Sequence, residues 1–204
     1  MAIFSTKVES YTEGSIIIGK TYGNWTVRWW QWALSMPKAV NPLCDKTGEN
    51  ANSNQPTDVW FLAGRFGSGD RWLPKRECIV PYGRPILFPI LNCEANPLEY
   101  PQLKSNEDII NHVRNDVDTI VRKECFVNGE RLVPVRVRSD PVLFQVNISK
   151  DLFEIPKSGE TLASADGYWM FLKPLRIGEY NIRFDGACEQ GRLNSGAEYQ
   201  IKVE

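Results

Sequence analysis

The sequence has little of the chemistry that usually supports metal-dependent or nucleophilic catalysis. It contains a single histidine, and its five cysteines are widely spaced, with no Cys-x-x-Cys pair. Both features argue against a zinc site. No Gly-rich phosphate loop leads into a helix, and no Gly-x-Ser-x-Gly nucleophile elbow is present. We therefore expect neither a metal nor a cofactor, and we favour a non-enzymatic function.

Long apolar runs and a strong net charge are also missing. No apolar run approaches the length needed to cross a bilayer, and residues 1–10 lack the apolar region of a secretory signal. The formal net charge of −1 provides no broad electrostatic surface for nucleic acid or anionic membrane. The sequence as written predicts a cytoplasmic protein, or one exported by another route, without a membrane span or a nucleic-acid partner.

The cysteines occur at an odd number of positions, which leaves two interpretations. Free and mostly buried thiols are favoured, and one or two disulfide bonds are the alternative. The five positions are Cys44, Cys78, Cys93, Cys125 and Cys188.

The segment 22–35 contains four of the seven tryptophans of the chain. Asn24 is a suitable N-cap and Pro37 cannot continue a helix, so we expect a helix of about three turns between them. Arg28 and Gln31 would point away from its apolar face. That face, at helical spacing, comprises Trp25, Trp29, Trp32 and Met36. Because each indole can bury roughly 150–250 Å², the helix needs a large apolar partner.

A second helix is predicted to begin after Ser105, with Asp108 completing a capping box. Its apolar stripe would comprise Ile109, Val113, Val117, Ile120 and Val121.

The remaining sequence favours strands. Residues 77–80 and 85–91 read as a strand pair around the turn 82–84, and prolines in the second run indicate strand ends or bulges. Asn128-Gly129 is a strong hairpin turn. Residues 179–184 and 198–203 alternate apolar and polar side chains.

About ten short strands with two helices, and no βαβ rhythm, predict an all-β fold. We expect an antiparallel β-sandwich, jelly-roll-like, packed on the N-terminal Trp-rich helix, with the whole chain 1–204 forming a single domain. Residues 1–13 would form an arm or an edge strand.

Several unusual strings of this chain resemble a group of uncharacterised archaeal and bacterial proteins. They are the tryptophan segment, of the form YGxWxxxWWQWALS, followed in order by residues 41–48, 59–64, 80–92 and the DGYW-type string 166–175. The resemblance covers the chain from about residue 20 to its end. It implies a shared fold and adds no chemistry. Members of the group often carry a secretion signal, which residues 1–10 of this chain lack, so the resemblance does not carry an extracellular location over to it.

Aromatic side chains are the first candidates for a binding site. Arg28 and Trp30 lie off the main apolar face of the first helix and could contact a ligand or partner, whereas the other tryptophans of the helix are expected in the core. Aromatic faces suit stacking with sugars or bases. Exposed Trp30, Trp72 or Tyr82 could therefore form a carbohydrate-binding surface.

Polar residues at strand ends form a second candidate site. Asn92 and Glu94 follow the apolar run 85–91, and Asp166 comes shortly before Trp169 in another strand. Two carboxylates at a suitable separation could hydrolyse a glycoside by acid–base catalysis. The alternative is that these side chains cap loops or are solvated.

Three weaker candidates remain. The oxygen-rich loop 45–54 could hold calcium but lacks the EF-hand spacing, and Asp185, Glu189 and Asn194 form a similar set. His112 reads as a surface residue of the second helix.

Three functions are compatible with these features. The first is a non-enzymatic structural or interaction protein that assembles as a homo-oligomer, and a virion component is one form of this because jelly rolls are common in capsids. The second is a carbohydrate-binding module, and the third is a hydrolase that uses Glu94 and Asp166.

Overall fold

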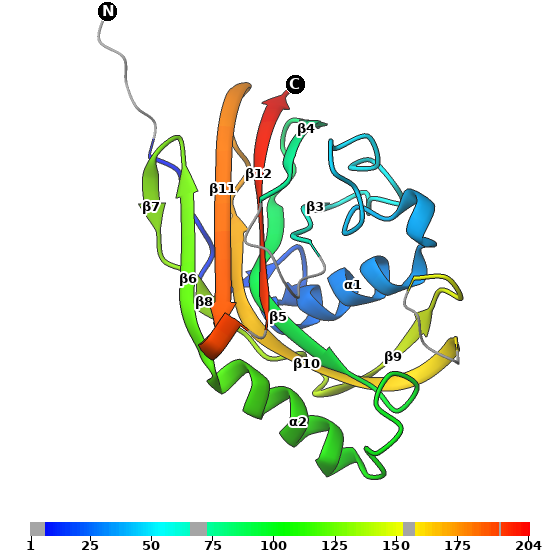
Figure 1. Cartoon of the computed structure of the whole chain (residues 1–204). Helices are drawn as coiled ribbons and strands as arrows, with labels where there is room; N and C mark the ends of the chain where they lie inside the picture. The colour runs from blue at the N-terminus through cyan, green and yellow to red at the C-terminus, as the bar shows by residue number, and fades with distance from the viewer. Residues whose placement is uncertain (1–6, 66–72, 153–157, 192) are drawn as a thin grey trace, which may run out of the picture.

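The computed structural model describes residues 7–65, 73–152, 158–191 and 193–204, and two packed β-sheets form its centre (Figure 1). In the first sheet the strand order is β3 (Trp60–Phe61), β5 (Ile86–Ala95), β10 (Gly159–Leu172) and β8 (Val135–Arg136), with β9 (Leu143–Ile148) also paired to β10. In the second sheet the order is β4 (Lys75–Val80), β12 (Asn194–Val203), β11 (Gly178–Cys188), β6 (Ile120–Val127) and β7 (Glu130–Leu132). A small hairpin of β1 (Ile16–Ile17) and β2 (Lys20–Thr21) precedes the first helix, and two short 3₁₀ turns cover Lys38–Val40 and Glu189–Gly191.

The predicted all-β class with two α-helices is confirmed for the described part of the chain. Antiparallel pairs predominate, as expected, but β3 pairs with β5 and β4 pairs with β12 in parallel. The predicted pairing of residues 77–80 with 85–91 is wrong, because the turn between β4 and β5 takes the chain from the second sheet to the first. The strand order does not establish a jelly roll.

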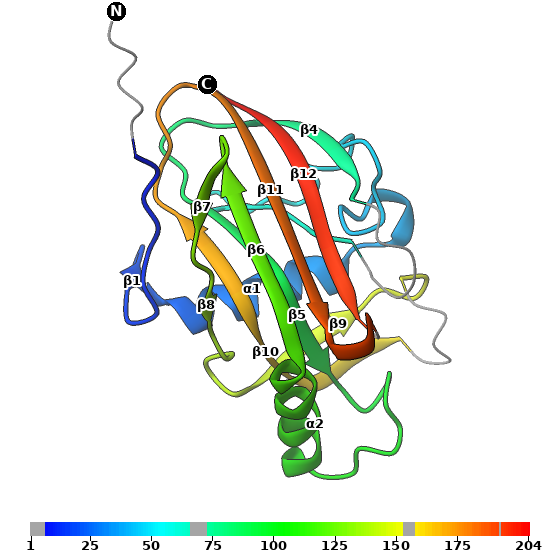
Figure 2. The ribbon, with the colours of Figure 1, turned by 60° about the vertical axis from the view of Figure 1, so that its left-hand side comes forward.

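Helix α1 (Tyr22–Ser35) covers the face of the first sheet that is turned away from the second sheet (Figures 1 and 2). The predicted apolar face is buried, with Trp25 and Trp29 packed edge-to-face on Phe61 and Trp169 respectively. Arg28 and Gln31 are exposed, as predicted. The tryptophan-rich helix is therefore the main apolar layer on this side of the molecule.

The helix starts earlier than predicted, because Thr21 and not Asn24 is the N-cap. The Thr21 hydroxyl accepts a hydrogen bond from the Asn24 amide at 3.0 Å, and the Asn24 side chain donates to the Asp140 carbonyl instead. Gly23 fits this first turn because a Cβ there would lie 2.6 Å from the Arg138 carbonyl oxygen.

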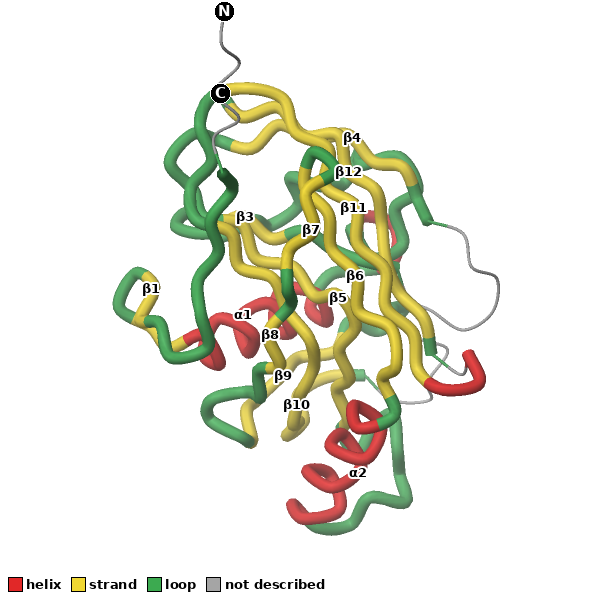
Figure 3. Tube along the Cα trace, turned by 90° about the vertical axis from the view of Figure 1, so that its left-hand side faces the viewer, coloured by secondary structure: helices red, strands yellow, loops and turns green. Residues whose placement is uncertain are grey.

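Helix α2 (Asn106–Asp118) has the predicted capping box between Ser105 and Asp108. It packs across one end of the two sheets (Figure 3). Its buried residues are Ile109, Val113 and Val117. The helix ends before Ile120, which begins β6, so the extension of its stripe to Val121 is wrong and Val121 is exposed.

Other local predictions are confirmed. Asn128 and Gly129 both have positive φ, +50° and +81°, and join β6 to β7 as a tight hairpin. Strands β11 and β12 pair in an antiparallel register. Of the N-terminal segment, Ser10 forms an isolated antiparallel bridge with Leu172 at the end of β10.

The cysteines, all of which lie in the described residues, form no disulfide bond. No helix in the described ranges is long and apolar enough to cross a membrane.

Candidate functional site

The clearest recess that contains predicted site residues lies along the open edge of β5. Strand β3 pairs only with Ile86 and Leu87, so the rest of β5 extends beyond it. A partly open cavity of about 140 Å³ lies there. It is bordered by α1, the chain after β3, β5, the loop after β5, α2 and the start of β12. Its lining comprises Trp29, Trp30, Leu43, Gly64, Arg65, Pro89, Leu91, Asn92, Cys93, Glu94, Glu99, Tyr100, Asp116, Leu193, Asn194 and Ser195.

A β-bulge in β5 determines which side chains reach this cavity. Tyr168 is paired with Leu91 and Trp169 with Pro89, so Ile90 is an extra residue in β5. Up to Ile90 the even-numbered residues face the second sheet, whereas from Leu91 onward the odd-numbered residues face that side and α2. Asn92 and Glu94 therefore project on the α1 side, beside Trp29 and Trp30.

Glu94 and Glu99 share one hydrogen-bond donor. The Asn96 Nδ2 lies 3.1 Å from the Glu94 Oε1 and 3.5 Å from the Glu99 Oε2. The Asn96 side-chain oxygen accepts from the backbone amides of Leu98 and Glu99, which fixes this amide in place. Two carboxyl groups are thus held next to each other on one wall.

Burial changes the protonation of both carboxyl groups. It raises the pKa of Glu94 to about 8, with a further contribution from the charge of Glu99 and an opposing one from the Asn96 hydrogen bond. It raises the pKa of Glu99 to about 7, again against the Asn96 hydrogen bond. At neutral pH the Glu94 carboxyl therefore keeps its proton, and Glu99 is close to half ionised.

A third acidic group and two rings complete this wall. The Tyr100 and His112 ring centroids are 4.5 Å apart, and the His112 Nε2 lies 3.6 Å from the Asp116 Oδ2. Burial, with the charges of Glu99 and Asp116, raises the pKa of Tyr100, so its hydroxyl stays protonated. His112, predicted as a surface residue, is half-buried beside the cavity instead.

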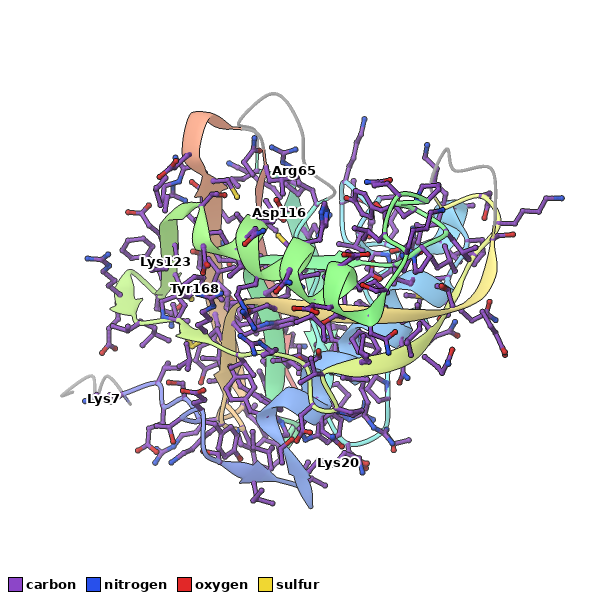
Figure 4. The ribbon with its side chains drawn as sticks, turned by 90° about the horizontal axis from the view of Figure 1, so that it is seen from below. Lys7, Lys20, Arg65, Asp116, Lys123 and Tyr168 are labelled. Atoms are coloured by element: carbon purple, nitrogen blue, oxygen red, sulfur yellow. The ribbon has the colours of Figure 1, made fainter. Side chains whose placement is uncertain are left out.

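Another wall of the cavity joins Arg65 to Asn194 and Ser195, which lie about 130 residues later in the sequence. The Arg65 guanidinium donates to the Asn194 side-chain oxygen, and the Ser195 hydroxyl donates to the Arg65 carbonyl at 2.8 Å. Arg65 and Asp116, both labelled in Figure 4, border the same cavity. This wall therefore contributes a cation as well as amide and hydroxyl groups.

Two buried donors on the lining have no hydrogen-bond partner among the described residues. They are the Trp30 Nε1 and the Asn92 Nδ2. Trp25, Trp29 and Trp32, by contrast, donate to the carbonyls of Ile17, Leu62 and Ser53. A buried donor without an acceptor is costly, by roughly 1–3 kcal/mol. Trp30 and Asn92, which carry these two donors, both line the cavity.

The cavity brings together three of the predicted site residues, namely Trp30, Asn92 and Glu94. Trp30 is only 7% exposed and its ring packs edge-to-face on Trp29, so the prediction of an open stacking surface at this residue is wrong. Trp169 is 1% exposed and belongs to the core beneath α1.

Three further predicted aromatic or basic residues lie elsewhere. The Arg28 guanidinium lies over the Trp25 ring at 5.5 Å on the exposed side of α1. Tyr82 is 61% exposed in the turn between β4 and β5. Trp72 lies outside the described residues.

The structure separates Asp166 from Glu94. Asp166 is paired with Cys93 in the β5–β10 register, whereas Glu94 is paired with Ala165. Because successive residues of a strand point to opposite faces, the two carboxyl groups lie on opposite sides of the first sheet. The hydrolase pair predicted from the sequence is therefore not assembled.

Asp166 is instead part of a salt-bridge network. Its carboxylate lies 2.8 Å from an Arg136 nitrogen and 3.9 Å from Arg138, and Arg136 also contacts Asp118 at 2.7 Å. Hydrogen bonds from Arg136 to Asp166 and Asp118 raise the pKa of this guanidinium. The network links β8, β10 and α2.

The loop 45–54 uses its acidic group internally. The Asp45 carboxylate accepts from the backbone amides of Thr47, Gly48 and Asn50. Burial would raise the pKa of Asp45, but these hydrogen bonds outweigh it and the pKa is lowered. Asp185, in the other weak candidate set, pairs with Arg122 at 2.9 Å.

Metal binding finds no support in the described ranges, which hold no group of three or more His, Cys, Asp or Glu side chains placed to bind an ion.

Several cavity residues were missed from the sequence. Glu99 and Tyr100 lie close in sequence to Glu94, and that proximity was the only available signal. Arg65 and Asp116 come from distant segments, and nothing in the sequence marks them as neighbours of β5.

Comparisons with known proteins give no relative: no protein-family model, no curated protein and no solved structure matches this chain.

Proposed function

We propose that this protein is a non-enzymatic binding protein that receives a small polar molecule, or the end of a larger one, in the cavity at the edge of β5. The observation that carries the proposal is the pair of unpartnered buried donors, Trp30 Nε1 and Asn92 Nδ2, on the lining of a cavity. Unpaired buried donors are expected where a ligand supplies the acceptor.

The composition of the lining supports the same conclusion. Ligand sites combine apolar and aromatic walls with a few convergent polar groups, and acidic groups of perturbed pKa are common in such sites. Trp29, Trp30 and Tyr100 provide aromatic surface, and Asn92 and Glu94 provide polar contacts. An engineered apolar cavity of comparable volume in another protein holds a benzene molecule, which sets the scale of the ligand.

A ligand screen tests the proposal. Purified protein would be tested for thermal stabilisation by separate sets of sugars, amines, amino acids, organic acids and nucleosides. Hits would be confirmed by the change in tryptophan fluorescence, since two indoles border the cavity. A hit at a dissociation constant below about 1 mM, weakened at least tenfold in Asn92→Leu and in Trp30→Phe, would support the proposal.

Trp169→Phe is the matched control for Trp30→Phe. Trp169 is also a buried tryptophan with an unpartnered Nε1, but it does not line the cavity. Equal loss of binding in both variants, or no hit in any class, would contradict a ligand site here.

A carbohydrate ligand is one member of the proposed class, and self-assembly is a separate proposal. The homo-oligomer predicted from the sequence stays a prediction. Size-exclusion chromatography with light scattering tests it, and a strict monomer at all concentrations would contradict it.

A further inference from the structure

Carboxyl groups outnumber basic groups around the cavity. Among the described residues that line it, Glu94, Glu99 and Asp116 are acidic and Arg65 is basic. The causes of the raised pKa of Glu94 are burial, the Glu99 charge and the Asn96 amide, and none of them is a cation. Among the described residues, neither Glu94 nor Glu99 forms an ion pair with the positive partner that buried carboxylates normally have.

The geometry of this wall suits a single cation. One amide nitrogen, that of Asn96, is within 3.5 Å of both carboxyl groups. A group as compact as an ammonium ion has three donors and could contact both carboxylates in the same way. Trp29, Trp30 and Tyr100 also line the cavity, and the faces of aromatic rings attract cations.

Two N–H donors elsewhere on the lining of the cavity could bind an oxygen acceptor of a ligand. The Trp30 Nε1 is unpartnered on a side chain that is more than nine-tenths buried, and Asn92 adds a second buried donor. A molecule with an amine at one end and a hydroxyl or carbonyl oxygen a few bonds away would satisfy both walls.

We infer that the ligand of this cavity is a small cationic amine bearing an oxygen acceptor, with its ammonium group held between Glu94 and Glu99. This inference rests on the proposed binding function and specifies the chemical class of its ligand. Without the amine, Glu94 and in part Glu99 are neutralised by protons. When the amine binds, these protons are released and the ammonium group neutralises the two carboxylates instead.

This replacement has a defined pH dependence. The free protein must release protons from Glu94, with its pKa of about 8, and Glu99, with its pKa of about 7, before both can pair with the amine. Affinity for a cation therefore rises from pH 6 through pH 8, where Glu94 is half ionised. A neutral ligand that accepts a hydrogen bond from the protonated Glu94 would show the opposite trend. Other charged or titratable groups border this region, so the dependence of affinity on pH reflects all of them together. They are Arg65, Tyr100, His112 and Asp116.

Matched probe pairs separate charge from shape. We would measure by calorimetry the binding of ethanolamine against ethylene glycol, serinol against glycerol, and glucosamine against glucose. Each amine is expected to bind at least tenfold more tightly than its uncharged partner at pH 7.5. For ethanolamine, measurements at pH 7 in phosphate and MOPS buffers, which differ in ionisation enthalpy and contain no primary amine, should show release of about 1.4 protons per molecule bound.

Variants of the two carboxyl groups complete the test. Glu94→Gln and Glu99→Gln should each weaken amine binding about tenfold and remove the rise with pH, whereas Glu130→Gln, at an exposed position of β7, should change neither.

The outcomes separate this inference from the proposed function. Uncharged partners that bind as well as the amines, or affinity that falls from pH 6 to 8, would overturn the amine inference and leave the binding function standing. Absence of any hit in the wider screen would overturn both. The change of amine affinity with pH in the wild-type protein tests the amine inference even if a variant fails to fold.

Discussion

Two buried carboxyl groups, one step apart in the register of β5 and β10, have opposite environments. Asp166 is 2% exposed and faces the α2 side, where Arg136 and Arg138 approach it. Glu94 faces the α1 side, where its carboxyl oxygen accepts a hydrogen bond from the neutral Asn96 amide.

The presence of a guanidinium explains the difference. A buried carboxylate is stable as an anion when a cation and hydrogen bonds replace its water, and otherwise it retains a proton. Asp166 has such partners and joins three elements of the fold. Glu94 has a raised pKa and borders a cavity instead. One face of this strand pair thus holds a carboxylate paired with arginine, and the other holds a carboxyl group of raised pKa beside the cavity.

Replacing Asp166 is expected to have the largest effect. Asp166→Asn leaves Arg136 without its buried carboxylate partner, and we expect a loss of about 3 kcal/mol in the free energy of unfolding, measured by urea denaturation. Asp118→Asn removes the exposed partner of the same guanidinium and should cost less than about 1 kcal/mol. Equal effects of the two substitutions would contradict a special role for the buried carboxylate.

Replacing Glu94 should have an effect that depends on pH. The native state keeps the Glu94 proton up to about pH 8, whereas the unfolded chain loses it near the ordinary value of 4.5. The native state therefore binds more protons in this window, and stability falls as pH rises through it. Glu94→Gln removes that fall, so the stability of the variant relative to wild type should increase steadily from pH 4.5 to pH 8.

Urea titrations at the two pH values measure this difference. If the free energy of unfolding changes with pH in the same way for the variant and the wild-type protein, Glu94 is ionised in the native state. That result would contradict the proposed difference between the environments of Glu94 and Asp166.

The smallest effect concerns two neighbouring tryptophans. Trp29→Phe loses a hydrogen bond to the Leu62 carbonyl and leaves that oxygen unpaired, so we expect a loss of about 2 kcal/mol. Trp30→Phe removes an unpartnered donor, and its cost should be smaller by about 1 kcal/mol because only ring packing is lost. Urea denaturation of both variants in one buffer gives the comparison, and a larger loss for Trp30→Phe would mean that its Nε1 has a partner.

The spacing of apolar residues correctly predicted elements that bury one regular apolar face against one other part of the protein. The α1 face of Trp25, Trp29 and Trp32 is buried as expected, because indoles at helical spacing require an apolar surface. The capping box of α2 and the Asn128-Gly129 hairpin follow from local hydrogen bonding and backbone conformation, so they could be predicted without tertiary information.

The pairing of strands was less predictable. Residues 77–80 and 85–91 resemble a hairpin, yet β4 pairs with β12, more than 100 residues later. Local sequence does not specify which sheet such a strand joins, because its pairing partner lies far away along the chain.

The candidate site was predicted in part. Asn92 and Glu94 were selected as polar residues at the end of an apolar strand, and both line the cavity. Their separation from Asp166 depends on the register of β5 with β10, which only the fold defines. The proline of β5 gave a partial signal, because Pro89 marks the irregularity at which the register shifts.

The extra residue of β5 at Ile90 has a consequence for the interior. Gly186 of the second sheet approaches so closely there that a Cβ on it would lie 2.8 Å from the Ile90 carbonyl oxygen, and the two sheets have little room for polar groups at this point. With an unbroken alternation, an amide and a carboxyl group would be forced into the dry layer between the sheets. The single extra residue reverses which face of the strand each later side chain is on. Asn92 and Glu94 therefore lie on the α1 side, and Leu91, Cys93 and Ala95 fill the apolar interior. Deleting that one residue would exchange the two sides of the strand beyond it, and the recess and the apolar interior would be lost together.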